Sequence, residues 1–409
     1  MRILHVVHQY PPEYIGGVEL YTRTLAHAQA ERGHQVTVFY RVQREGAGQT
    51  SRTEDGVQVW ASWAGIANPT RRLLDTWQSS FIARAFDRVL DETRPDLVHI
   101  QHLMGLPASV AHALTRREVP YLITLHDYWW VCANAQLITN YSGQVCGGPS
   151  LWLNCARCAL ARAGADWLWP ASPGLVPVFA WRSNLLRRVL RQARWLIAPA
   201  PFVKEWYTQH GIPAQKVQVV PHGVDAPVVP IPHRPSGGPI RFVYIGGLTW
   251  QKGLHVLVEA FSEIKGNAEL VIAGDESFDP AYVAGLQAKS SPKVRFAGRL
   301  AREQVWETLA QADAVVIPSL WFETFSLLAH EAFAAGVPVI VSRHGALADA
   351  VRDSVDGLQI SPGDVMAWRS ALQQLVDEPQ RLEQLRASVH PPMTLNEHVN
   401  RIEAVYNQL

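Results

Sequence analysis

Short apolar runs alternate along the chain with longer segments whose apolar residues recur at helical spacing. Residues 3–7 (ILHVV) and 36–40 (VTVFY) have the length and composition of buried strands, with a helix-like segment between them. The same alternation starts again at residues 241–245, continues in a helical pattern over 254–264 and reaches another apolar run at 270–273. The pattern therefore predicts two series of βαβ units, each with its own parallel sheet.

The break between the two series is rich in proline and glycine. Residues 221–239 read PHGVDAPVVPIPHRPSGGP, a composition typical of a linker. A chain of 409 residues also exceeds what a single core usually supports. We predict an α/β protein with an N-terminal Rossmann-like domain over 1–220, a linker over 221–239 and a second Rossmann-like domain over 240–390. Within the first domain, residues 131–177 are predicted to form a loop-rich excursion with clustered Cys and Trp.

Two carboxylates stand close together in a strand–loop–helix–strand unit over 314–341. Glu323 follows the strand 314–318, and Glu331 lies inside the helix predicted over 326–335, which Thr324 can cap. Open α/β sheets bind ligands at the carboxyl ends of their strands. Helix N-termini bind anions through free N–H groups, here those of Phe325, Ser326 and Leu327.

Carboxylates accept hydrogen bonds only, so hydroxyl-rich groups such as a ribose or a hexose suit Glu323 and Glu331. The alternative is that both are solvated surface acids.

Two glycine-rich turns follow strands of the two series. Gly16 and Gly17 come after the first strand, where paired glycines let backbone approach a ligand. The loop GGLTWQKG at 246–253 places Lys252 just before a helix, where the macrodipole disfavours a cation unless an anion such as a diphosphate is present. The alternatives are an ordinary turn and a lysine that bends into water.

His126 ends an apolar run at 121–125 and stands beside Asp127. A histidine titrates near neutral pH and an aspartate can orient it, so the two could form an acid–base pair. A structural histidine bonded to backbone is the alternative.

The four cysteines of the chain fall within 27 residues, and the last two form a C-x2-C pair. Such clustering favours a structural zinc site over disulfides in a reducing compartment. Plain thiols and disulfide pairs remain alternatives. The four are Cys132, Cys146, Cys155 and Cys158.

Residues 181–195 hold five arginines and no acid, on a helical apolar pattern. This predicts either a basic amphipathic helix that docks on an anionic membrane or a helix with solvated arginines.

The whole chain has a formal charge of only +1, from 37 basic and 36 acidic residues, which gives no indication of a nucleic-acid partner. No apolar run reaches transmembrane length, and the N-terminus lacks the pattern of a signal peptide. We expect a cytoplasmic protein, with peripheral contact at the inner face of the membrane as an option.

Glu323 and Glu331 followed by AFAAGVPVIVS, together with Lys252 in its loop, resemble the signature of the GT4-type retaining glycosyltransferases. The resemblance covers nearly the whole chain and is weakest between 133 and 194. It implies the GT-B fold, in which two Rossmann-like domains with parallel sheets face a central cleft. It also implies that a final helix over 391–409 returns to the N-terminal domain.

The resemblance assigns roles to individual residues. It implies that Glu323 binds hydroxyls of a donor sugar, with Thr324, Phe325 and Ser326 beside it, and that Glu331 holds a ribose. Lys252 would clamp the diphosphate, and His126 would face the donor sugar. Gly16 and Gly17 would admit donor phosphate and acceptor, and Gly274 and Arg299 would line the base pocket.

Gly247 departs from the family pattern, because an arginine that clamps the diphosphate is usual at this position. The chain therefore lacks one bidentate phosphate contact. Arg343 or Arg299 could compensate, and otherwise donor binding should be weaker.

The activity that the resemblance implies is transfer of a hexosyl group from a UDP- or GDP-sugar to an acceptor hydroxyl, with retention. The acceptor would be a saccharide or a lipid-linked saccharide in bacterial polysaccharide or glycoconjugate synthesis, and no catalytic cofactor is expected. A nucleotide-sugar epimerase, a silent partner subunit and a solute-binding protein are the alternatives.

Overall fold

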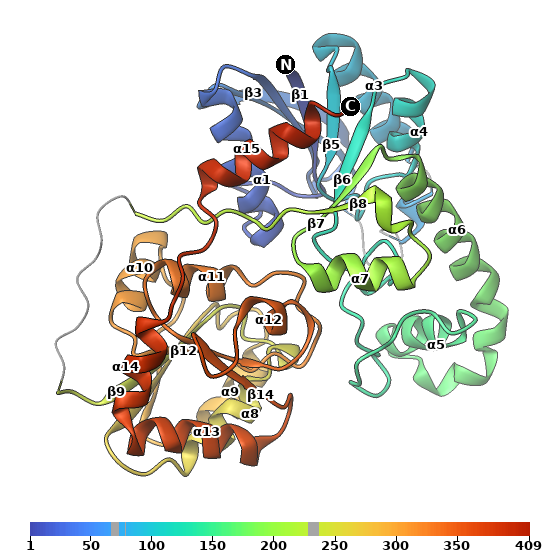
Figure 1. Ribbon diagram of the computed structural model, residues 1–409. Helices are drawn as coiled ribbons and strands as arrows, with labels where there is room; N and C mark the ends of the chain where they lie inside the picture. The colour runs from blue at the N-terminus through green and yellow to red at the C-terminus, as the bar shows by residue number, and fades with distance from the viewer. Residues whose placement is uncertain (67–72, 78, 228–236) are drawn as a thin grey trace. The chain divides into compact units, whose positions relative to one another are not determined.

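A computed structural model describes residues 1–66, 73–77, 79–227 and 237–409 (Figure 1). The chain divides into two compact units, one made of Met1–Pro221 with Leu395–Leu409 and the other of His222–Thr394. The predicted linker begins at this division, and its residues 228–236 lie outside the described residues.

The first unit contains an eight-stranded sheet in the order β3-β4-β2-β1-β5-β6-β7-β8. Neighbouring strands are parallel except β3 and β4. The strands are β1 (Arg2–Val6), β2 (Gln35–Arg41), β3 (Ala47–Glu54), β4 (Val57–Ala64), β5 (Leu97–Ile100), β6 (Tyr121–Thr124), β7 (Trp195–Ala198) and β8 (Val217–Val219).

The described helices of this unit include α1 (Gly17–Glu31), α3 (Ser80–Thr93), α4 (Ser109–Arg116), α5 (Leu153–Arg162), α6 (Val176–Gln192), α7 (Pro201–Gln209) and α15 (Leu395–Tyr406), with 3-10 segments η1 (Asp166–Leu175) and η2 (Ala214–Lys216). Figure 1 shows α15, drawn in red, beside the blue α1. Val399 and Ile402 of α15 pack in one core with Ile3 and Leu97, so the end of the chain belongs to the first unit.

Two features of this unit differ from the sequence-based expectation. The strand β3 is polar and partly exposed, so it lacks the apolar run by which the other strands are found. Its signal is the turn Asp55-Gly56, where both residues have positive φ as a two-residue hairpin requires. The excursion over 131–177 is also less irregular than predicted, because α5 and η1 fall within it.

The second unit contains a six-stranded parallel sheet in the order β11-β10-β9-β12-β13-β14. Its strands are β9 (Ile240–Ile245), β10 (Ala268–Ala273), β11 (Val294–Phe296), β12 (Ala314–Ile317), β13 (Val339–Ser342) and β14 (Gly357–Ile360). Its helices are α8 (Leu254–Ser262), α9 (Pro280–Lys289), α10 (Arg302–Ala310), α11 (Leu327–Ala334), α12 (Gly345–Ala350), α13 (Val365–Asp377) and α14 (Pro379–Ala387), with the 3-10 turn η3 (Trp250–Lys252) before α8.

Core residues cover both faces of this sheet. Phe242 belongs to one hydrophobic cluster and Val243 to another, because successive side chains of a strand point to opposite faces. The chain reverses its direction of travel across the sheet between β9 and β12, which are hydrogen-bonded neighbours. In open α/β sheets such a switch point is where ligands bind.

No helix within the described ranges is both long enough and apolar enough to cross a membrane.

Candidate active site

The switch point of the second unit brings Lys252 and Glu323 together. Nζ of Lys252, in the loop after β9, donates to Oε1 of Glu323, in the loop after β12, at 2.7 Å. The same oxygen accepts from Oγ of Ser319 at 2.7 Å and from the indole N–H of Trp321 at 3.0 Å. Nζ also lies 5.1 Å from the centre of the Trp321 ring, within cation–π range. The buried carboxylate therefore provides the negative partner that the position of Lys252 demands.

The two loops are held together by backbone packing around Gly253. Its φ is +74°, and a Cβ at this position would lie 2.0 Å from the carbonyl oxygen of Pro318. Close by, the N–H of Leu320 donates to the carbonyl of Gln251 at 2.8 Å. Glycine is required here both for the left-handed backbone and for the close approach of the two loops.

Gly345 supports the Glu323 loop from its other side. With φ at +60°, a Cβ at Gly345 would come within 3.0 Å of the Glu323 carbonyl oxygen, and the N–H of Ala346 donates to that carbonyl at 3.0 Å. Gly345 was not among the residues predicted from the sequence. Its signal is a glycine directly after the strand–end sequence VSRH, at a position that begins a helix.

The predicted cap of α11 is wrong by two residues. Ser326, and not Thr324, is the N-cap, and its Oγ accepts from the N–H of Ala329. Ser326 has the extended backbone conformation typical of a cap. The helix begins at Leu327, so the N–H groups of its first turn, which have no acceptor within the helix, lie just beyond the Glu323 loop.

Glu331 lies in α11 and forms an ion pair with Arg302. Burial raises the pKa of Glu331, and the attraction of Arg302 opposes that rise. The guanidinium of Arg302 is half exposed and lies over the Trp306 ring at 5.1 Å. Sequence reasoning did not find Arg302, because nothing local marks an arginine at the start of α10 as the partner of an acid 29 positions away.

The position of Gly247 is open. A Cβ on Gly247 would meet nothing within 4 Å, whereas a Cβ on Gly274 would lie 2.1 Å from the carbonyl oxygen of Gly246. Gly274 therefore serves close packing between the turns after β9 and β10. Of the proposed substitutes for the missing arginine, Arg343 bonds the carbonyl of Gln359 at 2.8 Å, and Arg299 is exposed.

In the first unit, the N-terminus of α1 is occupied by an acid. Gly16 is the N-cap residue, and a Cβ there would lie 2.5 Å from Oε2 of Glu19. Oε1 of the same buried carboxylate lies 3.3 Å from Nε2 of His8, and burial raises the pKa of Glu19. Gly16 thus makes room for the Glu19 side chain, which was not predicted from the sequence although it lies in the first turn of α1.

Asp127 pairs with His102 and not with its sequence neighbour. Nε2 of the buried His102 lies 3.1 Å from each carboxylate oxygen of Asp127, and Oδ1 also accepts from the N–H of Trp129 at 2.8 Å. The expected His126–Asp127 pair is therefore wrong. Adjacent side chains at a strand end diverge, and only the fold brings the loops after β5 and β6 together.

His126 instead begins a chain of buried hydrogen bonds. Its Nε2 donates to Oε1 of Gln101 at 2.9 Å, because an amide oxygen can only accept. The Gln101 amide donates to Nδ1 of His5 at 3.1 Å, so Nε2 of His5 carries the proton that it gives to Gln29 at 2.8 Å. Gln29 reaches Tyr406 of α15 at 3.2 Å. This series of hydrogen bonds fixes the tautomer of His126, with its proton on Nε2.

Burial holds the pKa of His126 well below its usual value, and neighbouring histidines lower it further. The pKa of His5 falls to about 4 for the same main reason. Both rings are therefore neutral at neutral pH, so His126 suits hydrogen bonding and not proton donation.

The four cysteines lie in the excursion of the first unit, two of them on α5. All are free thiols, and burial raises the pKa of Cys155 to about 12. A four-thiolate donor set suits zinc chemically. As placed, however, no three His, Cys, Asp or Glu side chains of the described ranges form a group that could hold a metal. The zinc site stays a prediction.

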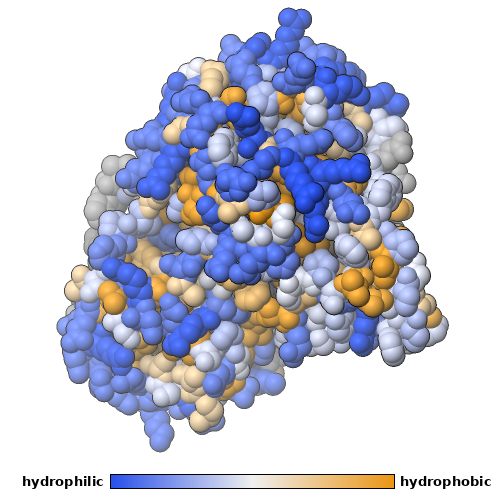
Figure 2. Space-filling view, turned by 45° about the vertical axis from the view of Figure 1, so that its right-hand side comes forward, coloured by the Kyte–Doolittle hydropathy of each residue, from blue (hydrophilic) through white to orange (hydrophobic). Residues whose placement is uncertain are grey.

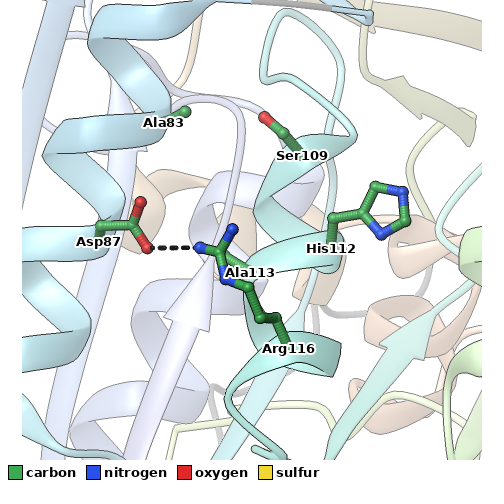
Figure 3. A pocket seen from close by; sticks show the side chains of 6 residues that line it. All are labelled: Ala83, Asp87, Ser109, His112, Ala113 and Arg116. Atoms are coloured by element: carbon green, nitrogen blue, oxygen red, sulfur yellow. Dashed lines mark ion pairs between the residues drawn. The ribbon is translucent and has the colours of Figure 1, made fainter.

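A cavity of about 340 Å³ lies on the first unit between α3 and α4 (Figure 3). Figure 3 shows Arg116 directed toward Asp87, with 3.6 Å between Nη2 and Oδ1. None of the predicted site residues lines it, so we do not assign the activity to it.

Comparison with known proteins decides the family. The family model described as Glycosyltransferase Family 4 matches residues 15–227, and the one described as Glycosyl transferases group 1 matches 230–389. The chain belongs to glycosyltransferase family 4.

Curated relatives of this glycosyltransferase cover most of both chains. It is 26% identical to a glycogen synthase of Mycobacterium tuberculosis, over 93% of this chain and 87% of the relative. It is 25% identical to a D-inositol 3-phosphate glycosyltransferase of Acidothermus cellulolyticus, over 91% and 81%.

Solved structures confirm the predicted GT-B fold. Sucrose-phosphate synthase from Thermosynechococcus elongatus matches with a TM-score of 0.75 at 21% identity, over 99% of this chain and 98% of that one. Anabaena HepE, solved in complex with UDP and glucose, matches with a TM-score of 0.71 at 17% identity over 100% of both chains.

Proposed function

We propose that this family 4 glycosyltransferase moves a hexosyl group from a UDP- or GDP-sugar to an acceptor hydroxyl with retention of configuration. The observation that carries the proposal is the bonded pair Lys252–Glu323 at the switch point of the second unit. It supplies a positive group for a diphosphate and a carboxylate for sugar hydroxyls, both on loops fixed by packing.

Lys252 and the N-terminus of α11 stabilise the leaving diphosphate in this proposal. Negative charge grows on the diphosphate as the bond to the sugar breaks, and fixed cations and N–H groups favour that charge at little cost of reorganisation. Phe325 and Ser326 precede the first turn of α11, so a phosphate placed there meets N–H groups that have no acceptor within the helix. No divalent metal is required for this role.

Glu323 binds hydroxyls of the transferred sugar through its second oxygen. The three donors from Lys252, Ser319 and Trp321 all converge on Oε1. Within the described residues no hydrogen bond reaches Oε2, and a carboxylate oxygen accepts from hydroxyl donors. The three fixed donors hold the carboxylate group in one orientation. Its second oxygen, Oε2, therefore also has a fixed position.

Glu331 holds the ribose, with Arg302 as its partner before the nucleotide arrives. The Arg302 guanidinium is half exposed, so it can turn into water when the nucleotide arrives, and the ribose hydroxyls then become the partners of the buried carboxylate. Gly274 and Arg299, at the turns after β10 and β11, are assigned to the base.

In the first unit we assign His126 to a hydroxyl of the donor sugar. A neutral ring of fixed tautomer is a directional hydrogen-bonding group and does not need to titrate. The loop of Gly16 and Gly17 is assigned to the acceptor and the donor phosphate. Because Glu19 brings negative charge to this helix end, an acceptor hydroxyl suits it better than a second anion.

A front-face displacement accounts for retention in this proposal. The acceptor oxygen forms its bond to the anomeric carbon on the face from which the diphosphate oxygen departs, and the acceptor proton passes to a departing phosphate oxygen. A double displacement would need a carboxylate nucleophile at the anomeric carbon. No carboxylate is assigned to that role here, because Glu323 is assigned to the sugar hydroxyls and Glu331 to the ribose.

The ligands bound by a similar protein favour UDP. HepE was solved with UDP and glucose and, separately, with UDP-glucose. The curated relatives are a glycogen synthase and a D-inositol 3-phosphate glycosyltransferase, so they support a role in bacterial polysaccharide or glycoconjugate synthesis without specifying the acceptor.

The test is an NMR assay of the first-formed product with UDP-glucose and a panel of saccharide acceptors. Retention requires the product to carry the same anomeric configuration as the donor. An inverted product would overturn the front-face route. Donor consumed at the same rate without any acceptor would instead identify an epimerase.

A further inference from the structure

Exposed hydrophobic side chains are concentrated in one short part of the first unit. Among the described residues, 17 large hydrophobic side chains are exposed, and eight of them lie between positions 145 and 181. Monomers rarely gather exposed apolar side chains in this way without a partner. The eight are Val145, Leu151, Leu153, Trp167, Leu168, Trp169, Val178 and Trp181.

Three tryptophans dominate this surface. The exposed fractions are 76% for Trp167, 54% for Trp169 and 59% for Trp181. Indole rings bury more apolar area than most side chains and also carry an N–H group. They are therefore enriched where one end of the ring is apolar and the other is wet, as at a membrane interface.

The exposure follows from the local fold. The segment η1 connects α5 to α6 and contains Pro170 and Pro173, which limit its hydrogen bonding. On α6, Phe179, Leu186 and Val189 form the face that packs into the unit. Trp181 lies on the opposite side of that helix from these buried side chains. It is therefore exposed although the apolar face of α6 is packed. Figure 2 shows hydrophobic side chains gathered on the side of the molecule that carries these helices.

The same part of the chain is strongly basic. Residues 131–195 contain seven arginines and one aspartate, a formal charge of +6, while the rest of the chain carries −5. The single acid, Asp166, is already paired with Arg157 at 3.3 Å. Arg157 also stacks over Tyr141 at 4.3 Å and Trp169 at 5.6 Å, so cation and indole lie together. Farther along, Arg188 and Arg191 are exposed on α6.

We propose that this surface, made of η1 with the exposed sides of α5 and α6, docks on an anionic phospholipid membrane. The tryptophans and leucines enter the headgroup region, and the arginines attract the acidic lipids. The charge disfavours a second copy of the chain, because the surface is net positive even though Arg182 is buried, and two such surfaces would repel each other. The aliphatic members Leu151, Leu153 and Val178 favour a lipid surface over a polar polyanion.

The test uses full-length protein in flotation assays with vesicles of phosphatidylcholine alone or with 30% phosphatidylglycerol. We expect binding to the anionic vesicles, weakening as salt rises, and little binding to the neutral ones. The variant W167A/W169A should bind at least tenfold more weakly. The matched control is Phe278→Ala, a side chain in the second unit that is also 76% exposed and should leave binding unchanged.

Arginine variants test the electrostatic attraction to acidic lipids separately from the insertion of the tryptophans into the membrane. Arg188→Gln with Arg191→Gln should weaken binding to anionic vesicles severalfold, whereas Arg84→Gln with Arg88→Gln, which removes two exposed arginines from α3, should have no effect. Because all these side chains are exposed, unfolding midpoints should match the wild type.

Failure of the wild-type protein to float with anionic vesicles would overturn the proposal. So would equal binding by W167A/W169A. A wild-type dimer that the tryptophan variant converts to a monomer would show that a second copy covers the surface instead.

Discussion

Nζ of Lys252 lies 2.7 Å from Oε1 of Glu323, although the two residues are 71 positions apart in the chain. A cation at the start of α8 and an acid after β12 look separately like poor choices for a phosphate site. Held together they neutralise each other, and a donor diphosphate can take over part of the interaction with Lys252. The pair is therefore the first target for mutation.

Glu323→Gln and Lys252→Met should each lower kcat by roughly a hundredfold or more, because each removes a charge that acts on the transition state. Glu263→Gln is the control, since Glu263 is also bonded to a basic side chain, Arg369 at 2.6 Å, but is exposed on the surface. Steady-state rates with UDP-sugar measure the effect. Wild-type turnover by E323Q would remove Glu323 from the catalytic site.

Gly247→Arg should strengthen donor binding. Its position has no atom within 4 Å of an added Cβ, and its φ lies outside the left-handed region, so an arginine fits without strain. Charge-assisted hydrogen bonds to phosphate contribute about 1.5–3 kcal/mol, so the Kd for UDP should fall about tenfold or more by calorimetry.

The control for that gain is Gly285→Arg, at an equally open position on α9. It adds the same charge to the same unit away from the site. Equal gains in both variants would mean that long-range attraction, and not a rebuilt clamp, is responsible.

Buried histidines should make stability fall in acid. Burial lowers the pKa of His5 and of His398 to about 4, against 6.5 in the unfolded chain. Between these values the unfolded state binds protons that the folded state does not, so the stabilisation is complete above pH 6.5 and is lost as pH falls toward 4. Each histidine contributes a slope of up to about 1.4 kcal/mol per pH unit.

Urea unfolding at pH 7 and pH 5 measures this loss. His5→Gln should reduce the difference between the two pH values, whereas His112→Gln, an exposed histidine of α4, should leave it unchanged. The same slope in His5→Gln and wild type would contradict the assignment.

Gly253→Ala should separate the two loops of the donor site. The added Cβ would lie 2.0 Å from the Pro318 carbonyl oxygen at a φ of +74°, and such strain costs about 1–3 kcal/mol or more. Gly285→Ala, in the interior of α9 with open space around it, should instead stabilise the protein by up to about 1 kcal/mol. Thermal melting together with UDP binding distinguishes the two, and an unchanged G253A would contradict the close packing.

Metal analysis decides the cysteine prediction. The four-thiolate donor set predicts about one zinc per purified chain, lost in Cys155→Ser with Cys158→Ser. The backbone N–H of Asn140 already donates to Sγ of Cys158 at 3.3 Å, a contact that also suits a thiolate. Protein that is purified without zinc, and whose four thiols all react with a thiol reagent, would contradict a zinc site.

The local pattern of the chain determined much of the fold. Apolar runs such as 3–7 and 314–318 located buried parallel strands, because such strands need no polar alternation. The same reading missed β3, whose partly exposed polar side chains carry no such signal. Lys252 and Gly247 could be identified from the sequence because they share one short motif in the loop after β9. Glu323 could be identified because it belongs to a second short motif, in the loop after β12.

Partnerships across the sequence were decided only by the tertiary structure. Asp127 stands next to His126 in the chain, yet it bonds His102, because loops after neighbouring strands meet at one sheet edge while adjacent side chains diverge. The ion pair of Arg302 with Glu331 and the packing of Glu19 against Gly16 are likewise contacts that only the folded structure shows. The sequence by itself determined which residues stand at strand ends. Which of them touch depends on strand order and close glycine packing, and a local pattern contains neither.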